Sequence, residues 1–291
     1  MRPFEYHAPS TLTEAVALLG RLEGAVSLLA GGTDLLVEVK GRGRRPDHLV
    51  DIKRIPDLAG LSWDPVAGLR IGALTMVRTV ETSSVVAAHY AGLAAAARSL
   101  GSIQIRNRAT VAGNICRASP SADTPPPLIA DGAVVRLVGP LGERIVALEA
   151  FFTGPGRSVL ARDEILVEIT VPPPAPRTGK VYLKHGRRLA MELATVGVAV
   201  ALTLAPDGET QEVRVVLGAV APTLIRARAA EAQLRGRVVD ASLIAEAAEA
   251  AEAEARPISD VRSSADYRRE MVRVLTARAL RQALQAAMLW S

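Results

Sequence analysis

Two glycine-containing segments of this 291-residue chain carry residue types that suit phosphate binding. The first, residues 30–34 (Ala-Gly-Gly-Thr-Asp), stands between an apolar stretch and a predicted helix. Glycine permits a positive φ and a close approach of another group to the backbone. Consecutive N–H groups in such a turn can surround an anion, and Thr33 adds a hydroxyl donor. Because Gly-Gly turns before helices are common, this segment alone leaves the phosphate interpretation open.

The second segment runs from Thr110 to Asn114 and continues through residues 118–124 (Ala-Ser-Pro-Ser-Ala-Asp-Thr). It offers a hydroxyl, a glycine backbone, an amide and the carboxylate of Asp123. Hydroxyl and N–H groups donate to phosphate oxygens, and a carboxylate accepts from sugar hydroxyls. The segment therefore suits a pyrophosphate with its ribose or ribityl hydroxyls. The alternative is a polar surface loop in which Asn and Asp cap turns.

Other chemistries lack their residues in this sequence. There is no Gly-x-Gly-x-x-Gly, Walker A or Gly-x-Ser-x-Gly motif, which disfavours an NAD domain, a P-loop ATPase and a hydrolase. One cysteine and four scattered histidines cannot supply the thiolates of an iron-sulfur cluster or the closely spaced ligands of a structural zinc site. We therefore expect no catalytic residue and no metal ligand in this chain, and place any metal chemistry in another polypeptide.

Charge and hydropathy limit the partners and the location. The basic run at residues 40–45 raises a nucleic-acid alternative, but a net charge of +5 is modest and aromatic residues make up only 3% of the chain. We expect no nucleic-acid binding. The longest near-apolar run, residues 193–205, is too short to cross a bilayer core of about 30 Å. No membrane span, no secretory signal and a single cysteine predict a cytoplasmic protein.

The elements that must position the two segments follow from apolar periodicity, caps and turn residues. The abundance of Gly and Pro between residues 101 and 127 predicts a long functional loop around the second segment. The first part of the chain is predicted to contain helices at 10–20, 35–40 and 85–100 and strands at 27–29, 48–52, 69–73, 133–138 and 164–171.

The proline-rich run at residues 172–176 predicts a domain boundary. We expect an α+β fold with one domain at 1–176, made of lobes at about 1–58 and 59–176, and a second domain at 177–291. The second domain is predicted to be a small antiparallel sheet covered by helices. Its predicted strands are 196–204 and 212–217, and its helices lie near 222–235, 241–256 and 264–289.

Residues 30–35 and 104–116, in this order, resemble the FAD-binding medium subunit of the molybdenum hydroxylases, a family that includes the carbon monoxide dehydrogenase and xanthine dehydrogenase types. One departure is visible, since the family usually has two glycines before the asparagine and this chain has Ala112 and Gly113. If residue 112 needed a positive φ, alanine would cost about 1 kcal/mol or more. The resemblance covers essentially the whole chain, continuing through residues 49–52, 71–75, 118–124, 182–184, Arg188, 259–262, Tyr267 and Arg268.

The resemblance implies a two-lobed FAD-binding domain of the vanillyl-alcohol-oxidase (PCMH) type followed by a small α+β C-terminal domain. It places the pyrophosphate and ribityl region of FAD on residues 28–35 and the second segment, and it places Leu160 and Lys184 nearer the flavin ring. The cofactor-binding residues that it implies are Leu28, Leu29, Ala30, Gly31, Gly32, Thr33, Asp34, Leu35, Leu100, Ala109, Thr110, Gly113, Asn114, Cys116, Arg117, Asp123, Leu160 and Lys184.

The resemblance also implies partners. A large subunit would oxidise substrate at a molybdenum cofactor, and a small subunit would pass electrons through two-iron (2Fe-2S) clusters to FAD, which delivers them to an external acceptor. We expect a dimer of such heterotrimers and no substrate oxidation by this chain alone. Two alternatives remain: a stand-alone FAD-dependent reductase on the same fold, and a cofactor-free assembly or nucleic-acid-binding subunit.

Overall fold

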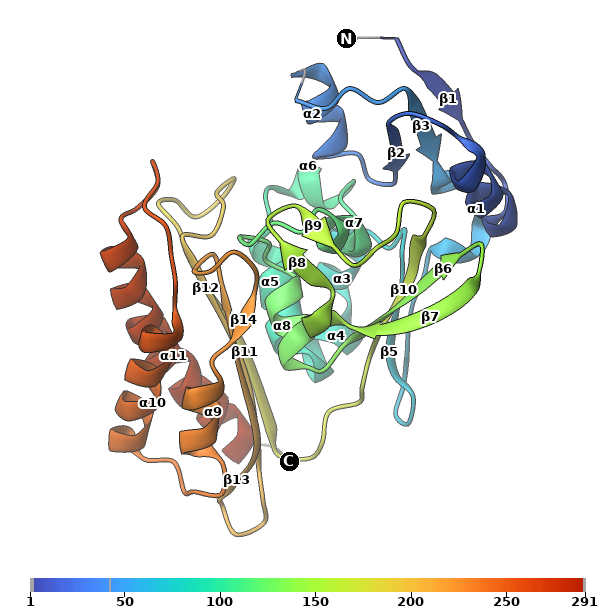
Figure 1. The fold of residues 1–291 in the computed structure, drawn as a ribbon. Helices are drawn as coiled ribbons and strands as arrows, with labels where there is room; N and C mark the ends of the chain where they lie inside the picture. The colour runs from blue at the N-terminus through green and yellow to red at the C-terminus, as the bar shows by residue number, and fades with distance from the viewer. Residues whose placement is uncertain (1–2, 42, 290–291) are drawn as a thin grey trace.

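The computed structural model describes residues 3–41 and 43–289 and is drawn in Figure 1. Arg42 of the basic run and the outermost residues of both predicted domains, 1–2 and 290–291, lie outside the described residues. The described chain forms an N-terminal lobe, a central sheet with helices, and a C-terminal sheet with helices (Figure 1). This arrangement confirms the predicted α+β class.

The N-terminal lobe contains a three-stranded parallel sheet in the order β1-β3-β2. Helix α1 begins after Thr11, whose hydroxyl accepts from the Glu14 N–H, while Glu14 accepts from the Ser10 N–H. These bonds satisfy the Glu14 N–H of the first turn and the Ser10 N–H just before the helix. The predictions for this region are confirmed to within two residues. The elements are β1 (Glu5–His7), α1 (Leu12–Arg21), β2 (Val26–Leu29), α2 (Leu35–Lys40) and β3 (His48–Asp51).

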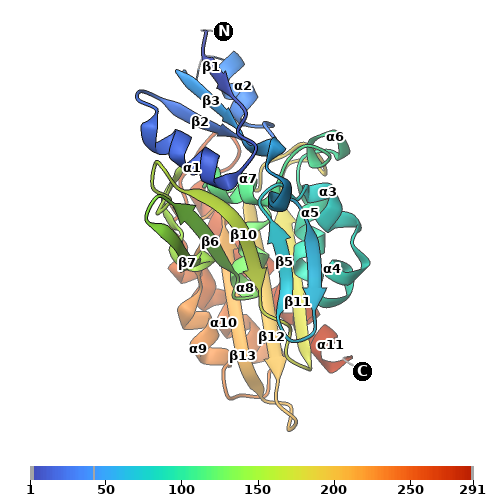
Figure 2. The same ribbon diagram turned by 90° about the vertical axis from the view of Figure 1, so that its right-hand side faces the viewer.

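A five-stranded antiparallel sheet follows, in the order β4-β5-β10-β6-β7. The N-terminal lobe stands at one end of this sheet, as Figure 2 shows. The predicted strands at 69–73, 133–138 and 164–171 are confirmed. The sheet is made of β4 (Leu61–Asp64), β5 (Gly68–Gly72), β6 (Val134–Gly139), β7 (Gly142–Ala147) and β10 (Ile165–Val171), and β8 (Phe152–Gly154) pairs with β9 (Arg157–Ser158) beside it.

The prediction of one helix over residues 85–100 is wrong, because the chain turns at Tyr90. Its backbone leaves the helical region at φ −137° and ψ 53° and separates α4 (Ser84–His89) from α5 (Ala91–Ser99). Tyr90 is fully buried, and its hydroxyl donates to the Pro172 carbonyl oxygen at 3.0 Å. A long-range contact at Tyr90 therefore overrides the helical pattern of its alanine-rich surroundings. A further helix, α3 (Val77–Thr82), precedes α4.

The predicted loop at residues 101–127 is also wrong in its local structure. Three short helices begin within it, two of them at side-chain caps: Ser102 accepts from the Ile105 N–H and Thr110 accepts from the Gly113 N–H. Capping makes such short helices possible despite the many Gly and Pro residues, because it satisfies N–H groups that lack helical partners. The helices are α6 (Ile103–Arg106), α7 (Val111–Cys116) and α8 (Pro125–Ala130).

The C-terminal part has a four-stranded antiparallel sheet between two layers of helices (Figure 1). Helices α5 and α8 pack on one face and α10 and α11 lie on the other side of the sheet. β12 is therefore buried on both faces and reads as a nearly continuous apolar run. The elements are β11 (Thr178–His185), β12 (Val196–Leu204), β13 (Thr210–Gly218), β14 (Ile225–Arg226), α9 (Arg228–Leu234), α10 (Ala241–Glu254) and α11 (Ala265–Met288).

The predicted β12-β13 hairpin and the three helical stretches are present, although the first stretch begins with β14. β11 was not predicted, although its two lysines, Lys180 and Lys184, alternate with apolar neighbours as in a strand, and both lysines are largely buried. β10 ends at Val171 and β11 begins at Thr178, on either side of the proline-rich run. Among the described residues, no helix is both long and apolar enough to cross a bilayer.

Candidate cofactor site

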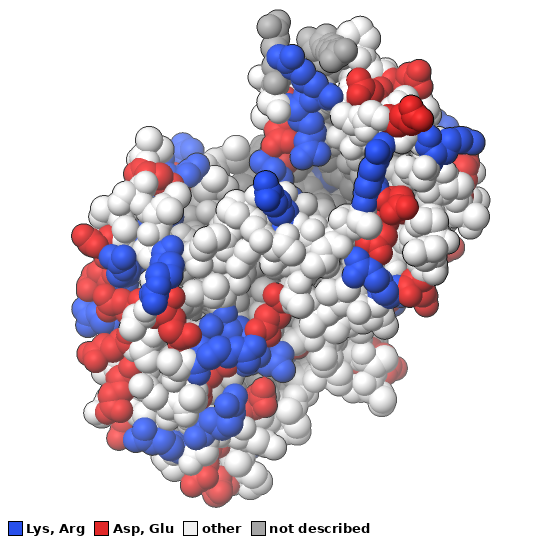
Figure 3. Space-filling view, viewed as in Figure 1, with Lys and Arg blue, Asp and Glu red and all other residues white. Residues whose placement is uncertain are grey.

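A pocket of about 570 Å³ lies between the N-terminal lobe and the two sheets. Gly32 of the first glycine segment and Asn114 of the second both line it, although they are far apart in sequence. The volume lies in the range of about 300–1,000 Å³ that is typical of small-molecule and cofactor sites. Figure 3 shows a face that is hollowed beneath the N-terminal lobe, with Lys and Arg side chains around the hollow.

The two glycine segments meet through backbone contact at Gly31. A Cβ atom at this position would lie 2.1 Å from the carbonyl oxygen of Arg108 and 3.0 Å from the Cα of Ala109. No side chain fits there without separation of the two segments. Gly32 has a φ of +75°, which residues with a side chain rarely adopt. Position 31 therefore requires glycine because the Arg108 backbone approaches it closely, and position 32 favours glycine because its φ is positive.

The first segment presents backbone donors. Within the described chain, the N–H groups of Gly32, Thr33 and Asp34 donate to no protein acceptor, whereas the carbonyl groups of Gly32 and Asp34 accept from residues of α2. All three residues line the pocket. Backbone N–H groups need a partner, and successive free N–H groups in a turn suit the oxygens of an anion. The first segment therefore has the donor set that a pyrophosphate requires.

The second segment is held in place by backbone bonds on both sides of Thr110. The Val77 N–H donates to the Ala109 carbonyl at 2.8 Å, and the Val111 N–H donates to the Thr75 carbonyl at 3.2 Å. The Thr124 hydroxyl donates to Oδ1 of Asn114 at 2.7 Å. The side-chain amide N–H groups of Asn114 remain as donors on the pocket wall. This wall therefore also suits phosphate or hydroxyl oxygens.

Ala112, where the sequence departs from the family pattern, causes no backbone strain. It lies inside α7, is buried, and is not among the described non-glycine residues with a positive φ. Gly113 also lies in α7, and a Cβ atom there would be 2.7 Å from Oγ1 of Thr110, the atom that caps the helix. A side chain is therefore excluded by close packing at position 113 and not at position 112, where alanine is compatible with the pocket.

Asp123 connects the pocket to the C-terminal sheet. Its carboxylate lines the pocket, is largely buried, and accepts from the Tyr182 hydroxyl and from Nζ of Lys184, each at 2.8 Å. Lys184 also donates to the Ser99 carbonyl at 3.1 Å. Burial raises the pKa of the Asp123 carboxyl, although the Lys184 ammonium opposes this shift. Burial and the nearby carboxylate raise the pKa of Tyr182 well above its ordinary value.

Three charged side chains form an ion-pair cluster on another part of the wall. Nη2 of Arg117 lies 2.6 Å from Oε1 of Glu38, and Nε of Arg44 lies 3.2 Å from Oε2 of the same carboxylate. All three residues line the pocket. Two guanidinium groups share one carboxylate, so the cluster carries a net positive charge, which favours an anionic ligand. Glu38 was not predicted, and Arg44 appeared in the sequence only as part of a basic run.

The structure brings most of the predicted site residues to one pocket. Leu29 and Lys184 do not line it: Leu29 packs beneath Gly32, and Lys184 reaches the wall only through Asp123. That the lining residues bind FAD stays a prediction. The predicted residues on the wall are Leu28, Ala30, Gly31, Gly32, Thr33, Asp34, Leu35, Leu100, Ala109, Thr110, Gly113, Asn114, Cys116, Arg117, Asp123 and Leu160.

Other parts of the wall were not predicted. Met191, Glu192 and Leu193 come from the connection between β11 and β12, and the Met191 N–H donates to the Gly101 carbonyl at 3.1 Å. Ile165 and Leu166 come from the start of β10. None of these residues stands in a recognisable motif, because only the packing of distant strands brings them to the pocket. The serines of the 118–124 segment, Ser119 and Ser121, also line it.

The lobes, the pocket and its donors define a protein that holds an extended phosphate-containing cofactor between two lobes and carries an additional α+β domain. Two domain families match this chain. Residues 2–174 match the FAD binding domain in molybdopterin dehydrogenase, and residues 181–283 match the CO dehydrogenase flavoprotein C-terminal domain. The chain belongs to the family of FAD-binding medium subunits of molybdopterin dehydrogenases, of the CO dehydrogenase and xanthine dehydrogenase type. The resemblance predicted from the sequence is thereby confirmed.

Relatives with known names match this chain in sequence over nearly their whole length. The carbon monoxide dehydrogenase medium chain of Hydrogenophaga pseudoflava is 40% identical over 281 residues, which is 96% of each chain. The xanthine dehydrogenase FAD-binding subunit of Escherichia coli is 35% identical, over 97% of this chain and 96% of that subunit. A solved structure of the Hydrogenophaga pseudoflava carbon monoxide dehydrogenase matches with a TM-score of 0.94 and 41% identity, and covers 98% of this chain and 99% of its own.

Proposed function

We propose that this chain is the FAD-carrying electron-transfer subunit of a molybdenum hydroxylase complex. The observation that carries the proposal is the contact of Gly31 with the Arg108 carbonyl, which brings two sets of anion donors to one pocket. The family to which the chain belongs supplies the identity of the cofactor. The pocket suits FAD through its glycine-lined wall and its mixture of donors and one buried carboxylate.

In this proposal each wall binds a different part of FAD. The N–H groups of residues 32–34 and the amide of Asn114 hold the pyrophosphate, Asp123 accepts from the ribityl or ribose hydroxyls, and Leu160 lies near the flavin ring. When bound, FAD supplies a redox centre that takes up electrons one at a time or in pairs. The protein orients this centre and sets its electrostatic surroundings. Lys184 acts indirectly, because it holds the Asp123 carboxylate in position.

The proposed partners are a large subunit with a molybdenum cofactor and a small subunit with 2Fe-2S clusters, assembled as a dimer of heterotrimers in the cytoplasm. The support is the designation of relatives as medium chains of carbon monoxide dehydrogenase. Cys116 is the only cysteine of the chain, so thiolates for such clusters must come from another subunit. Electrons would enter this chain from the small subunit and leave from FAD to an external acceptor.

We also propose the domain division at residues 1–176 and 177–291. The support is that the five-stranded sheet ends at Val171 and the four-stranded sheet begins at Thr178. The two domains contact each other through α5 and α8, which pack on the C-terminal sheet. The pocket includes residues 191–193 of the second domain, so this domain would complete the cofactor site.

The purified chain should take up one FAD and show the flavin absorption bands, yet oxidise no substrate without its partners. Co-purification with the two partner subunits should restore oxidation with an artificial acceptor. A chain that remains colourless with excess FAD would refute cofactor binding. Sustained turnover by the isolated chain would instead favour a stand-alone reductase, and a salt-sensitive mobility shift with DNA would favour a nucleic-acid-binding subunit.

A further inference from the structure

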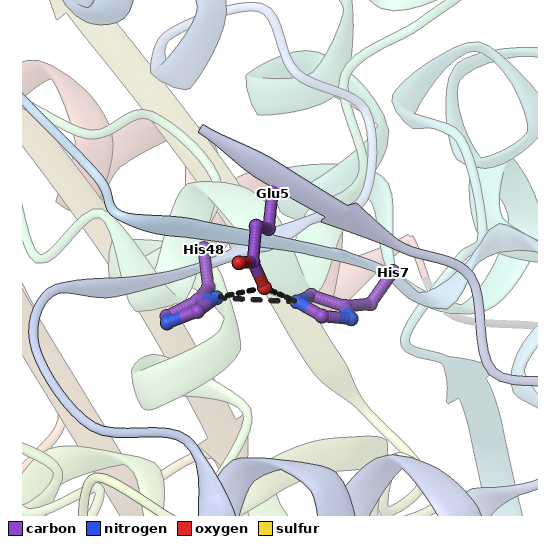
Figure 4. A group of neighbouring side chains, drawn as sticks. All are labelled: Glu5, His7 and His48. Carbon is purple, nitrogen blue, oxygen red and sulfur yellow. Dashed lines mark hydrogen bonds and ion pairs between the residues drawn. The ribbon is translucent and has the colours of Figure 1, made fainter. Parts of the chain in front are cut away.

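Three potential metal ligands meet on the N-terminal lobe, away from the pocket. Figure 4 shows the Glu5 carboxylate and the imidazole rings of His7 and His48 converging. Nδ1 of His48 lies 3.3 Å from Oε2 of Glu5, Nε2 of His7 lies 3.7 Å from the same oxygen, and the two nitrogens are 3.2 Å apart. The sequence analysis predicted no metal ligand in this chain, because forty-one positions separate His7 from His48.

The parallel pairing of β1 with β3 explains the convergence. Glu5 and His7 are two residues apart, so their side chains leave β1 on the same face. His48 is the register partner of Glu5 on β3 and lies beside it. The Glu5 N–H donates to the Asp47 carbonyl at 2.9 Å, which fixes the strands at this point. The three side chains therefore come from a rigid pair of strands.

The distances match those of a tetrahedral zinc site. Zn²⁺ binds imidazole nitrogen at about 2.0–2.1 Å, and two such ligands at the tetrahedral angle then lie about 3.4 Å apart. The three separations of 3.2, 3.3 and 3.7 Å bracket this value. Two imidazoles and one carboxylate are also a ligand set that zinc uses in proteins. We propose that Glu5, His7 and His48 bind one Zn²⁺ ion, with a fourth position open to water.

The burial of the two imidazoles favours a metal site over three flexible side chains on the surface. The side chains of His7 and His48 are only 23% and 17% exposed, while the Glu5 side chain is 73% exposed. His48 is two residues from the fully buried Val50 on the same face of β3. The imidazoles are therefore held by packing, and the exposed carboxylate leaves an entry path for the ion. Little ordering is required when the ion binds.

The proposed ion would join β1 to β3 at the amino ends of the strands. The pocket lies at the opposite end of this sheet, where residues 30–35 follow β2 and Ile52 follows β3. Zinc would therefore stabilise the N-terminal lobe without contacting FAD. Because an ion that binds only the folded state raises its stability, zinc should increase the temperature of unfolding. This role is independent of the proposed electron transfer.

The test uses the full chain, freed of any affinity tag and of metals. We expect one Zn²⁺ per chain by titration against a chromogenic chelator, and Co²⁺ in place of zinc should give the strong visible absorption of a four-coordinate site. His7→Gln or His48→Gln removes a direct ligand. Each should weaken binding by more than the roughly 10- to 100-fold that loss of an outer hydrogen-bond partner costs.

The matched control is His89→Gln in α4, where the imidazole stacks on Trp63 with ring centroids 4.3 Å apart. This variant should bind zinc as the unaltered chain does. FAD uptake by every variant provides a check that the chain is folded, and it should be unchanged. Absence of stoichiometric zinc uptake by the folded chain, or uptake that persists in the His7→Gln/His48→Gln double variant, would overturn the proposal and leave only a hydrogen-bonded cluster.

Discussion

Lys184 of β11 lies with its ammonium 2.8 Å from the carboxylate of Asp123, and both side chains are almost completely enclosed. One residue belongs to the C-terminal sheet and the other to the pocket wall. Tyr182, on the same strand, donates to the other carboxylate oxygen. The C-terminal sheet is therefore part of the support of the candidate cofactor site.

Replacing Lys184 by Met should destabilise the protein strongly. The substitution leaves the Asp123 carboxylate buried without its cation, and breaking a buried ion pair in this way costs about 3–5 kcal/mol. Urea unfolding followed by circular dichroism measures the loss of free energy. The double variant Lys184→Met/Asp123→Asn removes both charges and should recover part of the loss. Equal destabilisation by the single and double variants would contradict this account.

The defect of Lys184→Met should also depend on pH. Burial raises the pKa of Asp123 in the folded protein, and loss of the ammonium, which opposes that shift, should raise it further. When the pKa of a carboxyl is higher in the folded protein than its ordinary value of 3.8, the protonated carboxyl stabilises the folded state at pH values below 3.8. This stabilisation is lost as the pH rises through the folded-state pKa. The stability difference from the unaltered chain should therefore be largest near neutral pH and shrink in acid. A difference that is constant from pH 4 to pH 7 would exclude Asp123 as its cause.

Gly31→Ala should reduce FAD affinity. The added Cβ would lie 2.1 Å from the Arg108 carbonyl oxygen, so the two glycine segments must separate and their donors no longer face one ligand. We expect at least a tenfold loss, or about 1.4 kcal/mol, by titration of flavin fluorescence. Gly20→Ala is the matched control, because nothing lies within 4 Å of its added Cβ and alanine favours the α1 helix. Similar FAD affinities for the two variants would refute the role of Gly31.

Asn114→Asp should weaken FAD binding with little effect on folding. The carboxylate can still accept from the Thr124 hydroxyl, as Oδ1 of Asn114 does at 2.7 Å. It replaces two amide donors by a negative charge on a wall that we assign to the pyrophosphate. The expected change is tenfold or more in the dissociation constant, about 1.4 kcal/mol. Unaltered affinity would place the pyrophosphate elsewhere in the pocket.

Ala112→Gly should bring no gain in FAD affinity, although it restores the pair of glycines that the family usually has. The residue is buried inside α7 with helical backbone, where glycine costs about 1 kcal/mol relative to alanine. Thermal unfolding of the apoprotein should therefore occur at a lower temperature. A clear increase in affinity would mean that the bound state requires a backbone conformation different from the one described here.

Local signals in the sequence determined much of the fold. Thr11 caps α1, the turn at 206–208 joins β12 to β13, and both glycine segments line the pocket as expected. These features depend on neighbours within a few residues, so composition and periodicity reveal them. The same holds for the family resemblance, which rests on short motifs in a particular order.

Contacts between distant residues decided the rest. The turn at Tyr90 depends on the carbonyl of Pro172, the approach at Gly31 depends on the backbone of Arg108, and Lys184 contributes through Asp123. The grouping of His7 with His48 depends on the pairing of two parallel strands. Each of these residues is visible in the sequence, but nothing near it in the sequence indicates its partner. The two partners come within contact distance only when sheets and helices pack.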